Sequence, residues 1–152
     1  HTETLIMTAP VSLGPAPRAA VSLHDADSEH FWKPLGQSAS ADDAAERVGV
    51  VRRIRAPHVF ALSHLDGAPA CAGLGVLTGD LLGIYLMRTA PFARRKGMAR
   101  QILRALTHWG ATHEASSAYL QVEEQNAPAV NLYASEGFTI AGRYRYWRRS
   151  RH

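Results

Sequence analysis

The stretch that decides the fold is PFARRKGMARQILRAL, Pro91–Leu106. Its first half gathers cationic side chains just before Gly97. Beyond Gly97 the period becomes helical, because apolar residues recur three or four positions apart; they are Met98, Ile102, Ala105, Leu106 and Trp109. This pattern predicts an amphipathic helix of about thirteen residues that stops at Gly110. The apolar run LLGIYLM, residues 81–87, precedes the stretch, so a strand leads into a helix start.

A helix start is favourable for an anion. The first-turn amides lack partners within the helix, and the positive end of the helix dipole lies behind them. Gly97 and the small Ala99 let a phosphate approach the backbone, and Arg94, Arg95 and Lys96 add charge. The spacing fits neither a Walker loop nor the dinucleotide fingerprint. The residues alone therefore favour a phosphate site, with an exposed basic turn or a nucleic-acid contact as the alternatives.

The other segments predict an α+β domain. Three apolar runs, residues 58–65, 69–78 and 81–87, are separated by tight-turn residues and predict an antiparallel meander. A strand over residues 118–124 should run parallel to the third of them, because a helix joins the two. The remaining predictions are a strand over 18–24, helices over 25–36 and from Ser40 to 54, a short helix within 126–138 and a closing strand over 139–149.

Composition and punctuation set the domain boundaries. With 152 residues, 46% of them hydrophobic, the chain suits one globular domain. The proline-rich segment TAPVSLGPAPR, residues 8–18, predicts that 1–17 are an extension or linker and 18–152 the domain. No run has membrane-spanning length and no signal-peptide pattern is present, so we expect a cytoplasmic protein without a membrane partner. Cys71 is expected to be a core thiol, and the histidines lack metal-ligand spacing, so no metal is expected.

Basic residues are concentrated in two segments. Residues 1–50 hold three basic and seven acidic side chains, whereas 88–104 hold six basic and no acidic ones. The last ten residues contain a second cluster of five arginines: Arg143, Arg145, Arg148, Arg149 and Arg151. Such clusters indicate a local anionic partner, either a small phosphate-bearing molecule or a nucleic acid.

Two blocks of the sequence resemble one known family. Residues 94–99, RRKGMA, are similar to the R/Q-x-x-G-x-G/A motif of the GNAT superfamily, the acyl-CoA-dependent N-acetyltransferases, and Pro91 stands where that family commonly has a proline. Residues 120–138, LQVEEQNAPAVNLYASEGF, resemble its later strand and helix. The resemblance covers about Arg18 to Trp147. It implies a mixed, mostly antiparallel sheet with helices on both faces and a splayed parallel pair in the middle, with acetyl-CoA as co-substrate and an amine as acceptor.

The resemblance also implies a set of site residues. The turn Arg94, Arg95, Lys96, Gly97, Met98 and Ala99 would hold the coenzyme A diphosphate, and the main chain at Met87, Arg88 and Thr89 would hold the pantetheine arm and the thioester. Asn126 would bind the pantetheine region, and Tyr133 would be the general acid that protonates the leaving thiolate. Without the resemblance, Asn126 would be read as a helix cap and Tyr133 as an aromatic packed on a helix face.

The general base departs from the family pattern. Relatives that acetylate protein N-termini carry a glutamate twelve residues before the tyrosine, and here that position is Gln121, whose amide cannot accept the proton. Glu123 lies two residues on, faces the same side of a strand and is our candidate base. A weak base favours a low-pKa amine, because freeing a lysine amine at pH 7 costs about 4.6 kcal/mol and an α-amine about 1 kcal/mol. His30, Phe31 and Trp32 fall where relatives line the acceptor channel, with core packing as the alternative.

The sequence thus predicts transfer of an acetyl group from acetyl-CoA to a primary amine, either a small molecule or a peptide α-amine, by direct attack. A GNAT fold that binds acyl-CoA without turnover is one alternative, supported by Gln121. An Arg-rich nucleic-acid-binding module using RYRYWRRSR, residues 143–151, is a less favoured one, because strand alternation explains that segment too. Nucleic acid is therefore not the expected partner, and a homodimer is left open.

Overall fold

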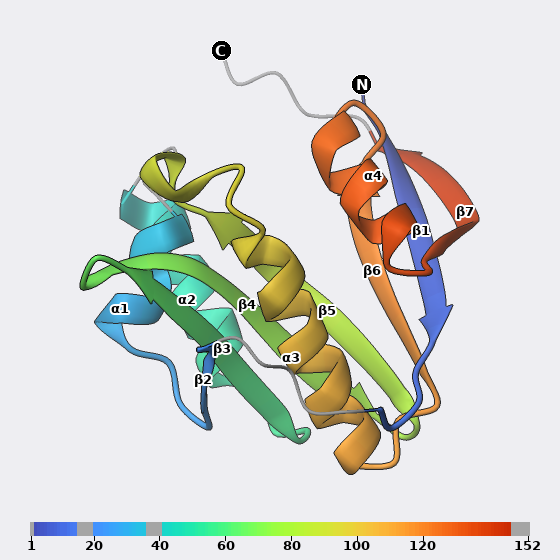
Figure 1. Cartoon of the computed structure of the whole chain (residues 1–152), viewed down its shortest axis with the longest axis horizontal. Helices are drawn as coiled ribbons and strands as arrows, with labels where there is room; N and C mark the ends of the chain where they lie inside the picture. Colours follow the sequence, from blue (N-terminus) through green and yellow to red (C-terminus); the bar gives the residue numbers. More distant parts are fainter. Residues whose placement is uncertain (1, 15–19, 36–40, 147–152) are drawn as a thin grey trace.

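A single seven-stranded sheet organises the computed structural model, which describes residues 2–14, 20–35 and 41–146. The strands lie in the order β2-β3-β4-β5-β6-β1-β7 (Figure 1). Their bounds are β1 Thr2–Pro10, β2 Ser22–His24, β3 His58–Leu65, β4 Ala68–Thr78, β5 Leu81–Thr89, β6 Ser117–Glu123 and β7 Thr139–Tyr146. The helices are α1 Glu29–Trp32, α2 Ala41–Arg52, α3 Met98–Thr112 and α4 Ala127–Ser135, with 3₁₀ turns Lys33–Leu35 and Pro91–Ala93.

The predicted meander is confirmed. β3, β4 and β5 pair antiparallel in succession, and the tight turns between them contain Asp66, Gly67 and Gly79 at positive φ. β5 and β6 are parallel, as expected for strands joined through a helix, and they lie in the middle of the sheet. The α+β class and the mixed, mostly antiparallel sheet are therefore as predicted.

The parallel pair is short, and this creates the central opening. β5 pairs with β6 only from Leu81 to Ile84, opposite Ser117 to Leu120. Just beyond, β5 carries a bulge against β4, and Leu86 adopts a φ of 56°. A bulge adds one residue to a strand and bends it. The second half of β5 therefore leaves β6, and the sheet splays as expected.

Helices cover both faces of the sheet. In Figure 1, α3 and α4 lie on the face toward the viewer, and α1 and α2 lie behind it. The α3 side chains Ile102, Leu103 and Leu106 are fully buried in the larger core cluster, which spans β1 and β3 to β6. On the opposite face, Phe31 of α1 packs edge-on against Phe60 of β3 in a second core cluster.

Two expectations are corrected by the structure. Residues 2–10 are not a linker: β1 pairs antiparallel with both β6 and β7, and its Leu5 and Met7 are almost fully buried. The partner strands lie more than a hundred residues away along the chain, so no local sequence pattern predicts their pairing with β1. Gly110 does not end α3, because the helix continues to Thr112. Gly110 is instead buried where a Cβ would approach Leu82 Cδ2 to 2.9 Å.

Some expectations lie outside the described residues. These are the linker residues 15–17, the first residues of the strand expected from Arg18, the helix end at Gly36, the cap at Ser40 and the tail beyond Tyr146 with its Arg148, Arg149 and Arg151. Within the described ranges, no helix combines the length and hydropathy required to cross a membrane.

Candidate active site

The turn between β5 and α3 has the geometry of an anion site. The 3₁₀ turn Pro91–Ala93 leads into Arg95 and Gly97, with φ of 64° and 74°. Gly97 is the N-cap of α3, and no side chain caps the helix there. A Cβ at Gly97 would meet no atom within 4 Å, so the glycine serves the backbone conformation and keeps the helix start open. The first-turn amides are thus left for an external acceptor.

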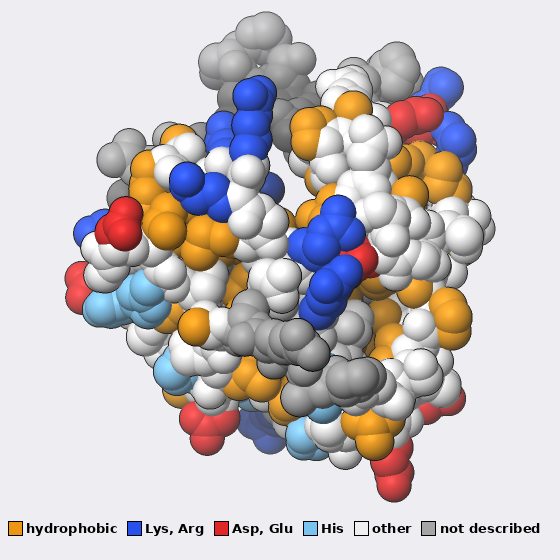
Figure 2. Space-filling view, in the orientation of Figure 1, with side chains coloured by type: hydrophobic (Ala, Val, Ile, Leu, Met, Phe, Trp, Pro, Cys, Tyr) orange, Lys and Arg blue, Asp and Glu red, His pale blue; other side chains and the backbone are white. Residues whose placement is uncertain are grey.

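A cleft of about 660 Å³ lies against this turn. Its walls come from the end of β5, the turn, the start of α3 and the face of α4. The predicted residues in its walls are Met87, Arg88, Thr89, Arg94, Arg95, Gly97, Met98, Ala99, Asn126 and Tyr133. Lys96 is exposed and lies outside the wall. Figure 2 shows the hollow between the start of α3 and α4, with Lys and Arg side chains on its rim. We call it the turn cleft.

A second cleft, of about 450 Å³, adjoins the first where β5 and β6 diverge. Its walls include Ile84–Arg88 of β5 and Leu120–Glu123 of β6. Among the described residues, the two clefts have five wall residues in common, namely Met87, Arg88, Asn126, Ala129 and Tyr133. The splay of the parallel pair thus opens a hollow that adjoins the cleft at the turn between β5 and α3. We call this second hollow the splay cleft.

Tyr133 stands at the junction of the two clefts. Its side chain is buried and packs at 6.1 Å between ring centroids against Phe138. Burial raises the pKa of the Tyr133 phenol, the Arg88 charge opposes that rise, and the nearby Cys71 thiol adds to it. The phenol is therefore protonated at neutral pH. Tyr133 therefore packs in the core, as one interpretation expects, and also lines both clefts.

Near the carboxyl end of β6, successive polar side chains project from opposite sides of the strand. Gln121 and Glu123 both line the splay cleft, whereas Glu124 is paired with Arg143 at 2.8 Å. Gln121 Oε1 accepts a hydrogen bond of 2.8 Å from the Tyr144 hydroxyl. Glu123 and Gln121 therefore lie on the same side of β6, as predicted, and both line the splay cleft.

Asn126 combines two positions that sequence reasoning treated as alternatives. It is the N-cap of α4, where its side-chain oxygen accepts a hydrogen bond from the amide of Ala129. It also lies in the walls of both clefts. Thr89, at the end of β5, lines the turn cleft and shares a 3.2 Å hydrogen bond with the buried Cys71 thiol. Burial raises the pKa of that thiol, as expected for a core residue.

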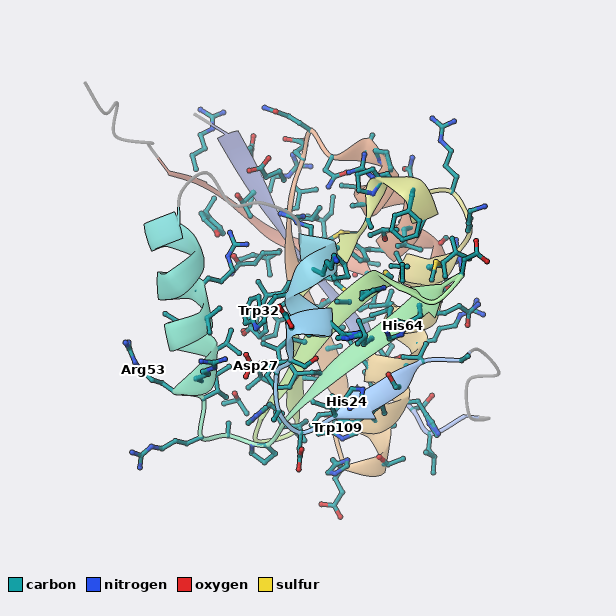
Figure 3. The ribbon with its side chains drawn as sticks, turned by 90° about the vertical axis from the view of Figure 1, so that its left-hand side faces the viewer. His24, Asp27, Trp32, Arg53, His64 and Trp109 are labelled. Carbon is teal, nitrogen blue, oxygen red and sulfur yellow. The ribbon has the colours of Figure 1, made fainter. Side chains whose placement is uncertain are left out.

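The aromatic cluster of α1 lies away from the clefts. Phe31 is fully buried in the second core cluster, and the Trp32 indole donates a 2.7 Å hydrogen bond to Asp27 (Figure 3). His30 contacts His64 at 3.2 Å between ring nitrogens. None of these three side chains is in the wall of the turn cleft or the splay cleft. The structure therefore supports core packing for Phe31 and, in part, for Trp32, whereas His30 is exposed.

Two features of the site were not foreseen. Arg100 and Arg104 of α3 both pair with Glu136, at 2.9 and 2.6 Å, and so fix the end of α4 that walls the turn cleft. Arg47 of α2 reaches the splay cleft. No local pattern marks either feature, because each partner lies more than thirty residues away along the chain.

Comparison with known proteins identifies the family. A family model described as "Probable histone acetyltransferase Rv0428c C-terminal" matches residues 1–147. The chain belongs to this family, and its fold is the one found in GNAT acetyltransferases of known structure. Its match to residues 1–147 includes β1, in agreement with the position of that strand inside the sheet.

Curated relatives are named as acetyltransferases. A mycothiol acetyltransferase of Nocardioides sp. is 30% identical over 126 residues, which is 80% of this chain and 39% of the relative. A streptothricin acetyltransferase of Escherichia coli is 32% identical over 63 residues, covering 41% of this chain and 36% of the relative. The chain thus spans less than half the length of these relatives.

Solved structures share the fold. A GCN5-related N-acetyltransferase from Sphaerobacter thermophilus superposes with a TM-score of 0.71 at 18% identity, over 94% of this chain and 50% of that one. The enzyme AAC(6')-Iy, solved with the bisubstrate analog CoA-S-monomethyl-acetylneamine, gives a TM-score of 0.65 at 14% identity, over 87% of this chain and 99% of that one.

Proposed function

We propose that this protein transfers the acetyl group of acetyl-CoA to a primary amine by direct attack. One observation carries the proposal: an uncapped helix start and the buried phenol of Tyr133 face two adjoining clefts at the splay of β5 and β6. Acetyl-CoA supplies an activated acyl group with a thiolate leaving group. The mycothiol and streptothricin acetyltransferases among the relatives support this reaction class.

The turn cleft suits the diphosphate of coenzyme A. The open amides at Met98 and Ala99 would donate to phosphate oxygens, and the guanidinium groups of Arg94 and Arg95 would add charge. The main chain of Met87, Arg88 and Thr89, which has left β6, would bind the pantetheine arm. An amide near Met87 directed at the thioester oxygen would stabilise developing negative charge, an effect of about 3 kcal/mol per donor.

The chemical step needs two proton transfers. A bond forms between the amine nitrogen and the acetyl carbon, the carbon–sulfur bond breaks, and its electron pair leaves on sulfur. Tyr133 would give its proton to that sulfur, since its raised pKa keeps the phenol protonated at neutral pH. Glu123, directly or through water, would take the proton from the amine. An α-amine is the easier acceptor for such a base because its pKa is about 7.8.

The test compares the parent protein with Tyr133→Phe in a coenzyme A release assay with a panel of amines. We expect at least a tenfold loss of kcat, about 1.4 kcal/mol, with little change in the KM for acetyl-CoA. The ring and its packing against Phe138 are kept, so the variant should fold. Unchanged turnover in Tyr133→Phe would remove the general-acid role. Faster acetylation of lysine side chains than of α-amines would contradict the acceptor preference.

A second candidate is acyl-CoA binding without turnover. It is favoured by Gln121, whose amide stands where some relatives carry a glutamate and is hydrogen-bonded to Tyr144. Acetyl-CoA binding with no release of coenzyme A to any amine would support this candidate over the enzyme.

A further inference from the structure

A third hollow, of about 570 Å³, lies between α2 and the strands β4 and β5. Six of its eight described lining residues are aliphatic, namely Val50, Val51, Ile54, Leu74, Val76 and Leu86, and the other two are Tyr85 and Arg47. It has Arg47, Tyr85 and Leu86 in common with the splay cleft, so the two hollows adjoin. We call it the apolar cavity.

The α2 wall of the apolar cavity is one face of the helix. Arg47, Val50 and Val51 stand at i, i+3 and i+4, and so project from the same side. Val51 is buried in the core, whereas Val50 is 54% exposed although it faces an apolar wall. On the β5 side, Tyr85 is 37% exposed. Apolar walls left open to solvent beside a reaction site favour a ligand with an apolar group.

Arg47 is the one arginine in the described wall of the apolar cavity. Arg52 is paired with Asp27, and Arg100 and Arg104 are paired with Glu136. Arg47 as a residue is partly buried, and among the described side chains no hydrogen bond or ion pair with it is found. An arginine that makes no ion pair with the described carboxylates suits an anionic ligand group, which its guanidinium can bind through two parallel hydrogen bonds.

The charges facing this junction agree with that preference. Arg88, on β5, adds a second guanidinium to the splay cleft. The one carboxylate in the described wall of the splay cleft is Glu123, and it is absent from the described wall of the apolar cavity. Of the residues that the two hollows have in common, Arg47 is the charged one, and the rest of the described wall of the apolar cavity carries no charge.

We propose that Arg47 and the apolar cavity select the acceptor: an amine that carries an apolar group and, close to it, an anionic group. The inference rests on the proposed function, because the amine must reach the splay cleft to be acetylated beside Tyr133. The apolar group enters the cavity between α2 and β4, and the anionic group pairs with Arg47 at its mouth. The amine is left directed toward Glu123 and Tyr133.

The test uses three amide-capped dipeptides as acceptors: Leu-Glu, Leu-Gln and Ala-Glu. Their α-amines have similar pKa values, so differences in kcat/KM report recognition. We expect Leu-Glu to exceed Leu-Gln roughly tenfold, because a hydrogen-bonded charge pair is lost in the second peptide. A similar factor is expected over Ala-Glu, because less apolar surface is buried.

Two variants and a matched control assign these preferences to residues. Arg47→Gln should bring the Leu-Glu to Leu-Gln ratio near one, and Val50→Gln should reduce the Leu-Glu to Ala-Glu ratio. Arg53→Gln removes the same charge from the segment at the end of α2, but Arg53 is exposed, points away from the body of the molecule (Figure 3) and lines neither hollow. Both ratios should persist in this control.

The outcomes separate the two proposals. Turnover of all three peptides at equal kcat/KM by the parent, or a charge preference that survives in Arg47→Gln, overturns the acceptor inference and leaves acetyl transfer standing. Absence of coenzyme A release with every amine, in a protein that binds acetyl-CoA, overturns the proposed function and this inference with it. Denaturant midpoints of the variants show that each is folded.

Discussion

Single residues with positive φ shape the turn and the strand that leads to it. Gly97 could be predicted, because glycine before a helix start with a cationic neighbourhood indicates an open anion site. Leu86 and Arg95 also have positive φ, yet neither residue type favours that conformation. Their conformations follow from the bulge in β5 and from the path of the turn. No local sequence pattern predicts either feature.

Gly97→Ala should weaken coenzyme binding. Its φ of 74° is unfavourable for alanine, so the variant should lose about 1 kcal/mol of unfolding free energy or shift the turn. The KM for acetyl-CoA should rise several-fold while kcat changes little, since Tyr133 is untouched. Steady-state kinetics and urea unfolding check both effects.

Gly79→Ala is the matched control for that variant. Gly79 has a φ of 63° in the β4–β5 turn, has open space around it and lies outside the clefts. It should show a similar loss of stability with an unchanged KM. Equal KM values for Gly97→Ala and the parent would mean that the turn does not approach the diphosphate.

Among the site residues, sequence could identify those that belong to local motifs. Tyr133 and Asn126 lie in one nineteen-residue block with the strand before them, so their spacing carried information. Arg47 could not be found in this way, because its role depends on Leu74, Val76 and Leu86 from distant strands. Residues made functional by packing between elements are invisible to spacing along the chain.

At the scale of elements, Glu136 holds α4 against α3. Its carboxylate accepts hydrogen bonds from Arg100 and Arg104, and only 13% of its side chain is exposed. The hydrogen bonds and charge of Arg104, with those of Arg100, hold the pKa of Glu136 below its ordinary value of 4.5, against an opposing effect of burial. A lowered pKa in the folded state means that the stabilisation is complete above about pH 5 and is lost as the pH falls through the folded-state pKa.

Glu136→Gln should therefore lower the unfolding free energy at pH 7 by about 1 kcal/mol, the upper range for partly exposed ion pairs. The difference from the parent should shrink as the pH falls below 4.5. Chemical unfolding across pH 3 to 7 measures it. Glu124→Gln removes the more exposed pair with Arg143 and should have the smaller effect. A pH-independent difference for Glu136→Gln would show that packing, and not charge, fixes α4.

At the scale of the whole molecule, local patterns predicted the elements and distant pairing decided their places. The meander and α3 follow from period and turn chemistry, and both were predicted. β1 was not predicted, because its partners are residues 117–123 and 139–146 and because the prolines from Pro10 onward suggested a linker. Because β1 lies between β6 and β7, these three strands form the part of the sheet on which α4, with Tyr133, lies (Figure 1).

Met7→Ala tests whether the N-terminal segment is part of the core. Met7 is 1% exposed within the larger core cluster, so truncation should cost about 3 kcal/mol through lost burial and a cavity. Leu13→Ala, in the same segment but 68% exposed, should stay within about 0.5 kcal/mol of the parent. A linker would tolerate both changes equally, so equal urea midpoints would contradict the central position of β1. β1 pairs with β6 along seven residue pairs, and β6 forms one wall of the splay cleft. A destabilised β1 should therefore also disturb this cleft, and we expect a lower kcat in Met7→Ala.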